Sequence, residues 1–292
     1  MKTALFTGCV IPIRYPGMEV ATRELAARLH VELEDVKFGC CPAPTGLKEV
    51  HFDAWLALAA RNLCLAEEKG LDVVTLCAGC TNTLRETNHI LAQDEKKRLF
   101  VHDILKRHGK TFRGTMNVHH LADFLATDEM LDRLEERLVR PLTGLKVGTH
   151  YGCHYYRPSN TMRDELPDPR YPLPDVMEKI LETLGAQVVE YGRQDLCCGA
   201  AMGINTGLTD EALQITDEKL ASMYQAGLDA LATACPTCFA QFDTGQALLR
   251  RKDKSRRSIP VYHIAELVAY ALGAEPERLD FKSHKTKTPF AE

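Results

Sequence analysis

Residues 71–80 read Leu-Asp-Val-Val-Thr-Leu-Cys-Ala-Gly-Cys, a short apolar run that ends in a Cys-x-x-Cys motif. Residues 228–238 repeat this arrangement as Leu-Asp-Ala-Leu-Ala-Thr-Ala-Cys-Pro-Thr-Cys. A short apolar run followed by a segment of helical period is typical of a buried strand in a parallel sheet. We therefore predict a strand, a cysteine-containing turn and a helix at both places, and we interpret the two copies as parts of an internal repeat.

The repeat includes ten of the eleven cysteines. In each half an adjacent pair of cysteines precedes the Cys-x-x-Cys motif, with 35 residues between them in the first half and 36 in the second. Near the start of each half, a further cysteine follows a predicted strand and a glycine. The first set is Cys9, Cys40, Cys41, Cys77 and Cys80, and the second set is Cys153, Cys197, Cys198, Cys235 and Cys238. Two sets in the same order indicate two similar metal–thiolate centres.

Helix and strand patterns recur in the same order around both sets. Segments of helical period span residues 19–30 and 52–69 in the first half and 175–184 and 209–225 in the second. A last strand leads to a histidine that lies 111 positions after the first cysteine in one half (His120) and 110 in the other (His263). Alternating strands and helices predict an α/β fold with two pseudo-symmetric Rossmann-like domains and small parallel sheets. We place these domains at residues 1–143 and 144–292.

Four of the cysteines come directly after predicted strands. They are Cys9, Cys77, Cys153 and Cys235. In open α/β sheets, ligands bind beyond the carboxyl ends of the strands. The predicted architecture therefore places these cysteines where such a sheet holds a cofactor.

Composition and charge argue against several classes of function. The chain has 292 residues and a formal net charge of −4, which gives no reason to expect nucleic-acid binding. It has no apolar run of the roughly 18 residues that a transmembrane helix needs. The N-terminus lacks the long apolar region of a signal peptide, so we expect a cytoplasmic protein. In that reducing compartment, many cysteines indicate metal binding or catalysis rather than disulfides.

Five thiolates per set exceed the four that a structural zinc ion or a cubane [4Fe–4S] cluster uses. Thiolate is a soft ligand that selects zinc, Cu(I) or iron–sulfur clusters. Adjacent cysteines are awkward ligands of one tetrahedral ion, because the backbone between them is short, but they can bind two irons. The count therefore favours a larger or less regular iron–sulfur cluster. The alternative is that one cysteine of each pair is a buried thiol without a metal, as we expect for Cys64, which lies outside both sets.

The motifs resemble a known family. The pattern Cys…Cys-Cys…Cys-x-x-Cys continues as Cys-Cys-Pro-Ala-Pro at residues 40–44 and as Cys-Cys-Gly-Ala at residues 197–200. It is similar to the cysteine-rich CCG domain. Over residues 1 to about 270 the chain resembles the B subunit of heterodisulfide reductase. Supporting stretches lie at residues 14–19, 59–68, 88–91 and 150–154.

The resemblance implies a function, cofactors and partners. Each set of five cysteines would hold one noncubane [4Fe–4S] cluster, in which one cysteine sulfur bridges irons. The disulfide of coenzyme M and coenzyme B, a reaction of methanogenesis, would be cleaved between the two clusters. Electrons would come from a ferredoxin-like [4Fe–4S] subunit and a flavin-containing electron-bifurcating subunit. The chain departs from the family in Ala78-Gly79, where Asn-Gly is expected, and in a longer segment at 160–174 that we expect to cover the site.

Other side chains are weaker candidates. The chain has no nucleotide-binding glycine motif, so we expect no flavin or nicotinamide site of its own. His154 follows a cysteine of the second set and is a candidate proton donor to a product thiolate, against the alternative of a surface histidine. His120 and His263 are expected to open helices. Arg14 and Arg157 are interpreted as exposed loop cations, although they are of a type that holds anionic groups. The polar tail from residue 281 onward is expected to be loosely held unless a partner covers it.

Two rival functions belong to other classes. One is a CCG-domain subunit of a succinate or fumarate reductase that passes electrons to quinone. The other is a structural zinc-binding scaffold. Iron clusters give visible absorption and EPR signals, whereas zinc gives neither, so spectroscopy separates the second rival from the redox functions.

Overall fold

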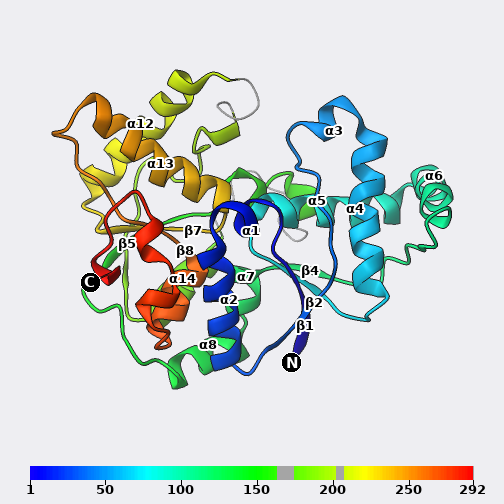
Figure 1. Ribbon diagram of the computed structural model, residues 1–292, viewed down its shortest axis with the longest axis horizontal. Helices are drawn as coiled ribbons and strands as arrows, with labels where there is room; N and C mark the ends of the chain where they lie inside the picture. The colour runs from blue at the N-terminus through cyan, green and yellow to red at the C-terminus, as the bar shows by residue number, and fades with distance from the viewer. Residues whose placement is uncertain (163–173, 202–206, 292) are drawn as a thin grey trace. The chain divides into compact units, whose positions relative to one another are not determined.

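The computed structural model describes residues 1–162, 174–201 and 207–291 (Figure 1). The chain divides into two compact units. Unit 1 contains Met1–Cys9, Val31–Leu121 and a segment that starts at His154. Unit 2 contains Val10–His30, Ala122–Cys153 and the C-terminal part of the chain. In each half of the repeat, the segment directly after the first cysteine therefore belongs to the other unit. The contiguous division at residue 143 stays a prediction.

Each unit is built on a four-stranded sheet in which all strands are parallel. The order of strands is β2-β1-β3-β4 in unit 1 and β6-β5-β7-β8 in unit 2, which is the same order in the two halves of the repeat. The predicted α/β fold with two small parallel sheets is confirmed. The strands are β1 (Lys2–Phe6), β2 (Glu32–Asp35), β3 (Val73–Thr75), β4 (Val118–His120), β5 (Lys146–His150), β6 (Gln187–Val188), β7 (Ala230–Thr233) and β8 (Val261–His263).

The predicted helical segments also form, with ends that differ from the prediction by a few residues. They correspond to α2 (Pro16–Arg28), α4 (Phe52–Glu67), α10 (Val176–Thr183) and α12 (Thr209–Ala226). The other helices are α1 (Val10–Arg14), α3 (Leu47–Val50), α5 (Ala78–Gln93), α6 (Glu95–Lys106), α7 (Leu121–Leu125), α8 (Asp128–Glu136), α9 (Ser159–Met162), α13 (Pro236–Lys252) and α14 (Ile264–Ala271). Short 3-10 turns lie at η1 (Cys153–Tyr155), η2 (Pro276–Arg278), η3 (Phe281–Ser283) and η4 (Pro289–Ala291).

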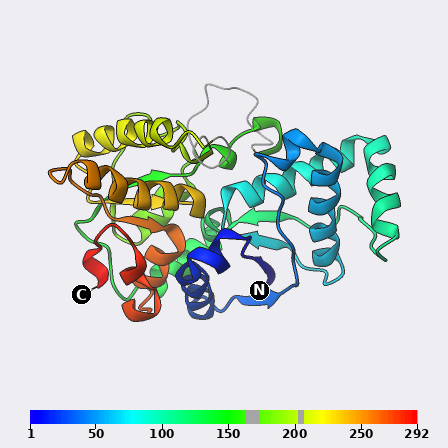
Figure 2. The same cartoon turned by 45° about the horizontal axis from the view of Figure 1, so that its top comes forward.

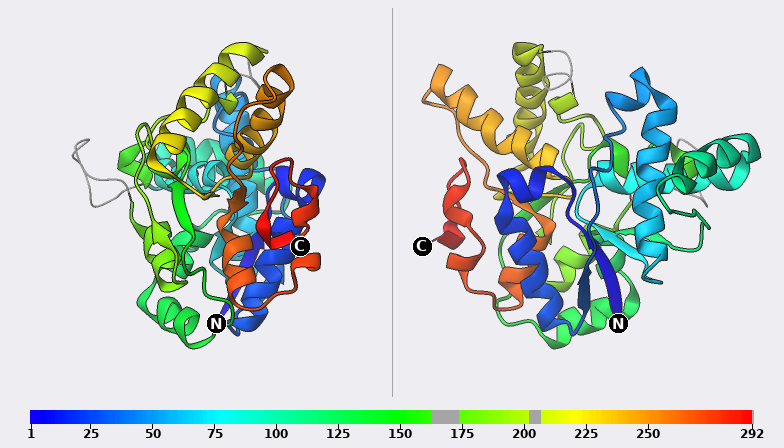
Figure 3. Two further views of the ribbon diagram at one scale, coloured as in Figure 1. Left: turned by 90° about the vertical axis from the view of Figure 1, so that its left-hand side faces the viewer. Right: turned by 45° about the vertical axis from the view of Figure 1, so that its right-hand side comes forward.

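Helices pack on each other and on the sheets within each unit. In unit 2, α12 and α13 lie side by side (Figure 2). In the same unit α2 packs against α14 (Figure 3), which explains why the segment Val10–His30 belongs to unit 2. The covering side chains are small or apolar, for example Ala21 and Leu25 on α2, which are buried. Among the described residues, no helix combines the length and the apolar character that a membrane crossing needs.

The order of strands fixes where a ligand site can form. In both sheets the first strand of the half lies between the second and third strands. The chain therefore adds the second strand on one side of the first and the third strand on its other side. In open α/β sheets, ligands bind at such a reversal, beyond the carboxyl ends of the two central strands, which are β1 and β3 in unit 1 and β5 and β7 in unit 2. Cys9 and Cys77 follow β1 and β3, and Cys153 and Cys235 follow β5 and β7.

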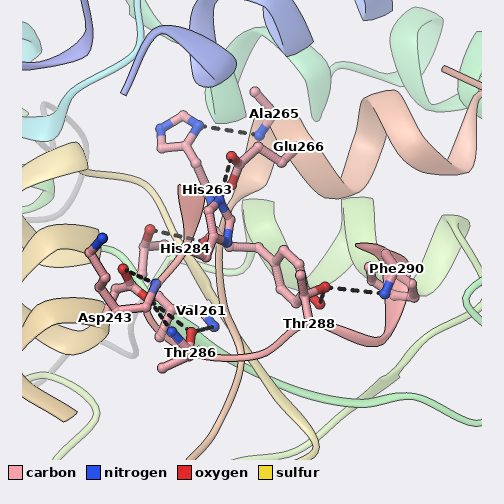
Figure 4. Close-up of polar contacts among 12 residues, drawn as sticks. Asp243, Val261, His263, Ala265, Glu266, His284, Thr286, Thr288 and Phe290 are labelled. Carbon is pink, nitrogen blue, oxygen red and sulfur yellow. Dashed lines mark hydrogen bonds and ion pairs between the residues drawn. The ribbon is translucent and has the colours of Figure 1, made fainter. Parts of the chain in front are cut away.

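The expectation of a loosely held C-terminal tail is wrong (Figure 4). Buried Asp243 accepts hydrogen bonds from the backbone N–H of Lys285 at 2.9 Å and from the N–H and hydroxyl of Thr286 at 2.8 Å. His284 faces Glu266 across 3.1 Å, with side chains only 3% and 2% exposed. The phenyl ring of Phe281 is also buried. A carboxylate on α13, far away in sequence, therefore fixes the tail, and a polar composition alone does not reveal such a partner.

Candidate metal centres

The Cys-x-x-Cys motif of each half begins a helix. Cys77 and Cys235 are the N-cap residues of α5 and α13, with nearly identical backbone angles (φ −143°, ψ 124° and φ −142°, ψ 124°). Cys80 and Cys238 lie in the first turn and are buried. The exposed N–H groups and the dipole of a helix N-terminus stabilise negative charge. The strand end thus delivers two thiols of each set to a position that favours an anionic group.

The adjacent cysteines of the first set lie on a loop that is fixed by Asn62 of α4. The buried Asn62 side chain accepts a hydrogen bond from the N–H of Gly39 at 2.8 Å and donates one to the carbonyl oxygen of Cys40 at 2.9 Å. The Cys41 sulfur then lies 3.2 Å from the Cys80 sulfur. Cys40 also interacts with Cys9, so the structure brings the five thiols of the first set together in unit 1.

Gly8 allows the close approach of strand and cysteine in this set. Its φ is +70°, a left-handed conformation that glycine adopts without the penalty of other residues. A Cβ atom at this position would lie 3.0 Å from the Cys80 sulfur. Both the backbone conformation and the space for sulfur therefore require glycine before Cys9.

The second set has the same arrangement in unit 2. The sulfurs of Cys198 and Cys238 are 3.5 Å apart, and the N–H of Gly199 donates to the Cys197 sulfur at 3.3 Å. Cys153 hydrogen-bonds with Cys197 and lies within electrostatic range of Cys235. The structure therefore brings all five thiols of the second set together as well.

A buried lysine holds the loop that leads into the second pair of cysteines. Lys219 of α12 is only 1% exposed, and its ammonium donates to the carbonyl oxygens of Arg193, of Gln194 at 3.3 Å and of Leu196 at 2.8 Å. Burial lowers the pKa of Lys219 to about 8, while nearby cysteines oppose that shift. Lys219 thus fixes the loop of Cys197 and Cys198 as Asn62 fixes the loop of Cys40 and Cys41. It also adds a positive charge beside the second set.

The thiols of each set are too crowded to ionise together without a cation. Hydrogen bonding to Cys41, together with burial, raises the pKa of Cys40, and contacts with Cys41 and Cys77 do the same for Cys80. In the second set, contact with Cys198 and Cys235 raises the pKa of the buried Cys238. Thiolate is the form that binds metal. A cationic metal core supplies the charge that several adjacent thiolates need, so the donor chemistry fits an iron–sulfur cluster.

His150 lies against the second set, three residues before Cys153. It is 1% exposed, and neither ring nitrogen makes a hydrogen bond of normal geometry in the part of the chain that the structure describes, although the Gln194 backbone lies close to the ring. Its nearer ring nitrogen and the sulfurs of Cys198 and Cys238 lie within 4.8 Å of one another. Burial lowers the pKa of His150 to about 3, which keeps the imidazole neutral. A neutral imidazole can bind a metal or donate one N–H.

The remaining candidates lie in different places. His154 is half-buried in η1, and its role as proton donor stays a prediction. Arg14 and Arg157 are exposed cations, but only Arg157 lies in a loop, because Arg14 is the last residue of α1. His263 caps α14, since its ring accepts the N–H of Ala265, and His120 directly precedes α7.

Two further outcomes concern Cys64 and the longer segment of the second half. Cys64 packs with Trp55 and Leu56 in an apolar cluster, which confirms the expectation of a core thiol. The covering segment expected at 160–174 falls largely on residues 163–173, which lie outside the described residues.

Sequence reasoning missed His150, Asn62 and Lys219 as parts of these sites. A signal for the last two does exist in the repeat, because each lies 21 positions after the second cysteine of its adjacent pair. Otherwise, a polar residue at these positions of an amphipathic helix looks in the sequence like one that faces solvent. Only the structure shows that both are buried.

Comparisons with known proteins agree with this geometry. The family called Cysteine-rich domain (CCG) matches residues 3–85 and 147–243. The B subunit of the ferredoxin:CoB-CoM heterodisulfide reductase of Methanosarcina mazei is 38% identical over 97% of this chain and 93% of its own length. The 8-methylmenaquinol:fumarate reductase membrane anchor subunit of Wolinella succinogenes is 29% identical over 94% of both chains.

A solved structure supports the fold. The crystal structure of a hypothetical protein from Helicobacter pylori superimposes with a TM-score of 0.78 over 99% of this chain, at 14% identity. This chain spans about half, 52%, of that structure's length. At this identity the likeness concerns the fold alone. With both cysteine-rich regions matched and close sequence similarity over nearly the whole chain, the protein belongs to the family of heterodisulfide reductase B subunits and carries two CCG domains.

Proposed function

We propose that this chain is the catalytic iron–sulfur subunit of a heterodisulfide reductase complex. In this proposal the first set and the second set each hold one noncubane [4Fe–4S] cluster, and the substrate is the coenzyme M–coenzyme B disulfide or a related one. The observation that carries the proposal is the convergence of five thiols beyond the carboxyl ends of the central strands in each of two parallel sheets. A position in the cytoplasm stays a prediction.

The reaction has a simple balance. One S–S bond breaks, two electrons and two protons are consumed, and two thiols are released. The clusters, when bound, supply the electrons and a soft metal surface for sulfur. The chain's own residues hold the donor sulfurs in place, through the N-termini of α5 and α13 and the fixed loops at Asn62 and Lys219. His154 is the proposed proton donor to one product thiolate.

The electrons come from other subunits in this proposal. The relatives are named as subunits of larger reductases, which supports partner subunits for this chain. We propose a ferredoxin-like [4Fe–4S] subunit and a flavin-containing electron-bifurcating subunit as these partners. The sequence has no nucleotide-binding glycine motif that would let the chain bind a flavin or nicotinamide by itself.

Anaerobic turnover with a chemically reduced dye tests the function. The reconstituted protein, alone and with its partner subunits, is offered the coenzyme M–coenzyme B disulfide, other low-molecular-weight disulfides and a quinone. Oxidation of the dye together with release of two thiols per disulfide is expected. Quinone reduction without turnover of any disulfide would overturn the proposal.

That second outcome would favour the rival function. The similarity to a subunit of a quinol:fumarate reductase is the observation in its favour. The lower identity, 29% against 38%, makes it the second candidate.

A further inference from the structure

The two halves of the repeat differ at two positions that lie against the cysteines. Phe6 lies three residues before Cys9, and His150 lies three residues before Cys153. Asn62 and Lys219 each lie 21 residues after the second cysteine of their adjacent pair. The first set is therefore accompanied by a phenyl ring and a neutral amide, and the second by an imidazole and an ammonium.

The corresponding side chains lie near corresponding cysteines. Phe6 packs in one apolar cluster with Cys41 and Cys80 of the first set. A ring nitrogen of His150 lies within 4.8 Å of the sulfurs of Cys198 and Cys238, the equivalent members of the second set. The exchange of phenyl for imidazole thus takes place beside the same pair of sulfurs in each half.

The imidazole lacks a well-formed hydrogen bond in the described part of the chain. His150 is buried, and neither of its nitrogens makes a hydrogen bond of normal geometry among those residues, with the Gln194 backbone as a nearby polar group. Its ring packs edge to face on Phe242, with 5.0 Å between the ring centroids. A buried imidazole without well-formed hydrogen bonds is unfavourable, because its donor and acceptor lose their hydrogen bonds to water. A group bound by Cys198 and Cys238 would face one of these nitrogens and satisfy it.

The ammonium group of Lys219 is fixed by hydrogen bonds to the backbone. Three carbonyl oxygens of the segment before Cys197 fix the Nζ atom of Lys219, and the side chain is buried. Leu196, whose carbonyl oxygen accepts from Nζ at 2.8 Å, directly precedes Cys197, so the charge lies beside the second set. A buried positive charge is screened little by solvent, so it acts strongly on a nearby redox centre.

We propose that the two centres are electrochemically different, and that the second set holds the one with the higher reduction potential. This inference rests on the proposed function, since it requires an iron–sulfur centre at each set. Reduction adds one electron to a centre and makes it more negative. A contact from a ring nitrogen of His150 and the charge of Lys219 stabilise that reduced form, as hydrogen bonds and nearby charge do at iron–sulfur clusters. Phe6 and Asn62 give the first centre no comparable stabilisation.

Potentiometric titration followed by EPR tests the proposal, with dithionite as the electron donor. The unmodified protein is expected to show two separate transitions. His150→Phe and Lys219→Asn, which install the residues of the first half, are expected to lower the upper potential and leave the lower one in place. Cys9→Ser and Cys153→Ser assign each transition to its set. His119→Phe, a substitution of the same kind on half-exposed β4, is the control and is expected to change neither potential.

A second readout reports the contact of His150 directly. With ¹⁵N-labelled histidine, pulsed EPR is expected to detect a nitrogen coupling at the upper-potential centre that His150→Phe removes and His119→Phe keeps. If His150→Phe and Lys219→Asn both keep the full iron and sulfide content and both show the same potentials as the unmodified protein, this inference is overturned and the proposed function stays intact. A protein without iron and sulfide would instead overturn the proposed function. If His150→Phe loses iron and the other variants do not, His150 is a structural ligand of the metal, which also contradicts the proposal.

Discussion

At the scale of single residues, the sites depend on sulfur and on the space left for it. Cys41 and Cys64 are both buried thiols, but Cys41 lies 3.2 Å from another sulfur whereas Cys64 packs among apolar side chains. The sequence separates them only through the repeat, to which Cys64 does not belong. Their substitution by serine therefore distinguishes a ligand from a core thiol.

Cys41→Ser is expected to remove about half of the iron, because one of two four-iron clusters loses a ligand. Cys64→Ser is expected to keep the full iron content and to lower the free energy of unfolding by about 1–3 kcal/mol, because a hydroxyl without a partner is buried. Iron and acid-labile sulfide per chain, together with denaturant unfolding, measure both effects. Equal iron content in the two variants would contradict the assignment of Cys41.

Two glycines offer a matched pair. Gly8 and Gly70 both have positive φ, at +70° and +64°, but a Cβ atom would approach the Cys80 sulfur only at Gly8, since nothing lies within 4 Å at Gly70. Each substitution by alanine is expected to cost roughly 1–2 kcal/mol of backbone energy. Only Gly8→Ala is expected to lower the iron content as well. Iron loss in both variants would show that strain alone, rather than contact with sulfur, disturbs the first centre.

At the scale of elements, the C-terminal tail depends on buried charge. Burial by itself lowers the pKa of His284, but the facing Glu266 carboxylate outweighs this effect, and Asp243 and Asp280 add to it, so that the pKa is raised above its ordinary value. A raised pKa in the folded protein stabilises it below the ordinary value of about 6.5. This stabilisation is lost as the pH rises through the folded-state pKa.

The attachment of the tail is therefore expected to weaken as the pH rises above neutrality. Amide exchange of residues 281–290, measured at several pH values after correction for the intrinsic rate, reports the opening of the tail. His284→Gln, which cannot be protonated, is expected to remove the pH dependence. If both proteins show the same pH dependence, the His284–Glu266 pair does not hold the tail.

The elements also show what the sequence could predict. The strands β3 and β7 and the cysteines that follow them were predictable, because apolar runs and repeated spacing are local signals. The burial of Lys219 was not, because a lysine in an amphipathic helix usually faces water and its carbonyl partners lie on a distant loop. The tail was misjudged for the same reason, since its partner Asp243 lies about forty residues earlier.

At the scale of the whole molecule, two compact units each contain one complete set of cysteines. Loss of one centre is therefore expected to leave the other assembled. Cys80→Ser and Cys238→Ser should each retain about half of the iron, and the double variant should retain almost none. Loss of all iron in a single variant would show that the two centres form only together.

The compact units group segments that are distant in the sequence. The division near residue 143 stays a prediction of the repeat, and Val10–His30 belongs to the same compact unit as most of the second half. Packing of α2 against α14 causes this, and no local pattern in residues 16–28 records which helix it will meet.

The most direct test of the central claim is the metal content of the anaerobically reconstituted chain. Two four-iron clusters predict about eight irons and about eight acid-labile sulfides per chain, with little zinc. EPR is then expected to show two iron–sulfur signals, one lost in Cys41→Ser and the other in Cys198→Ser. A chain that binds zinc alone, without iron or sulfide, would contradict the account.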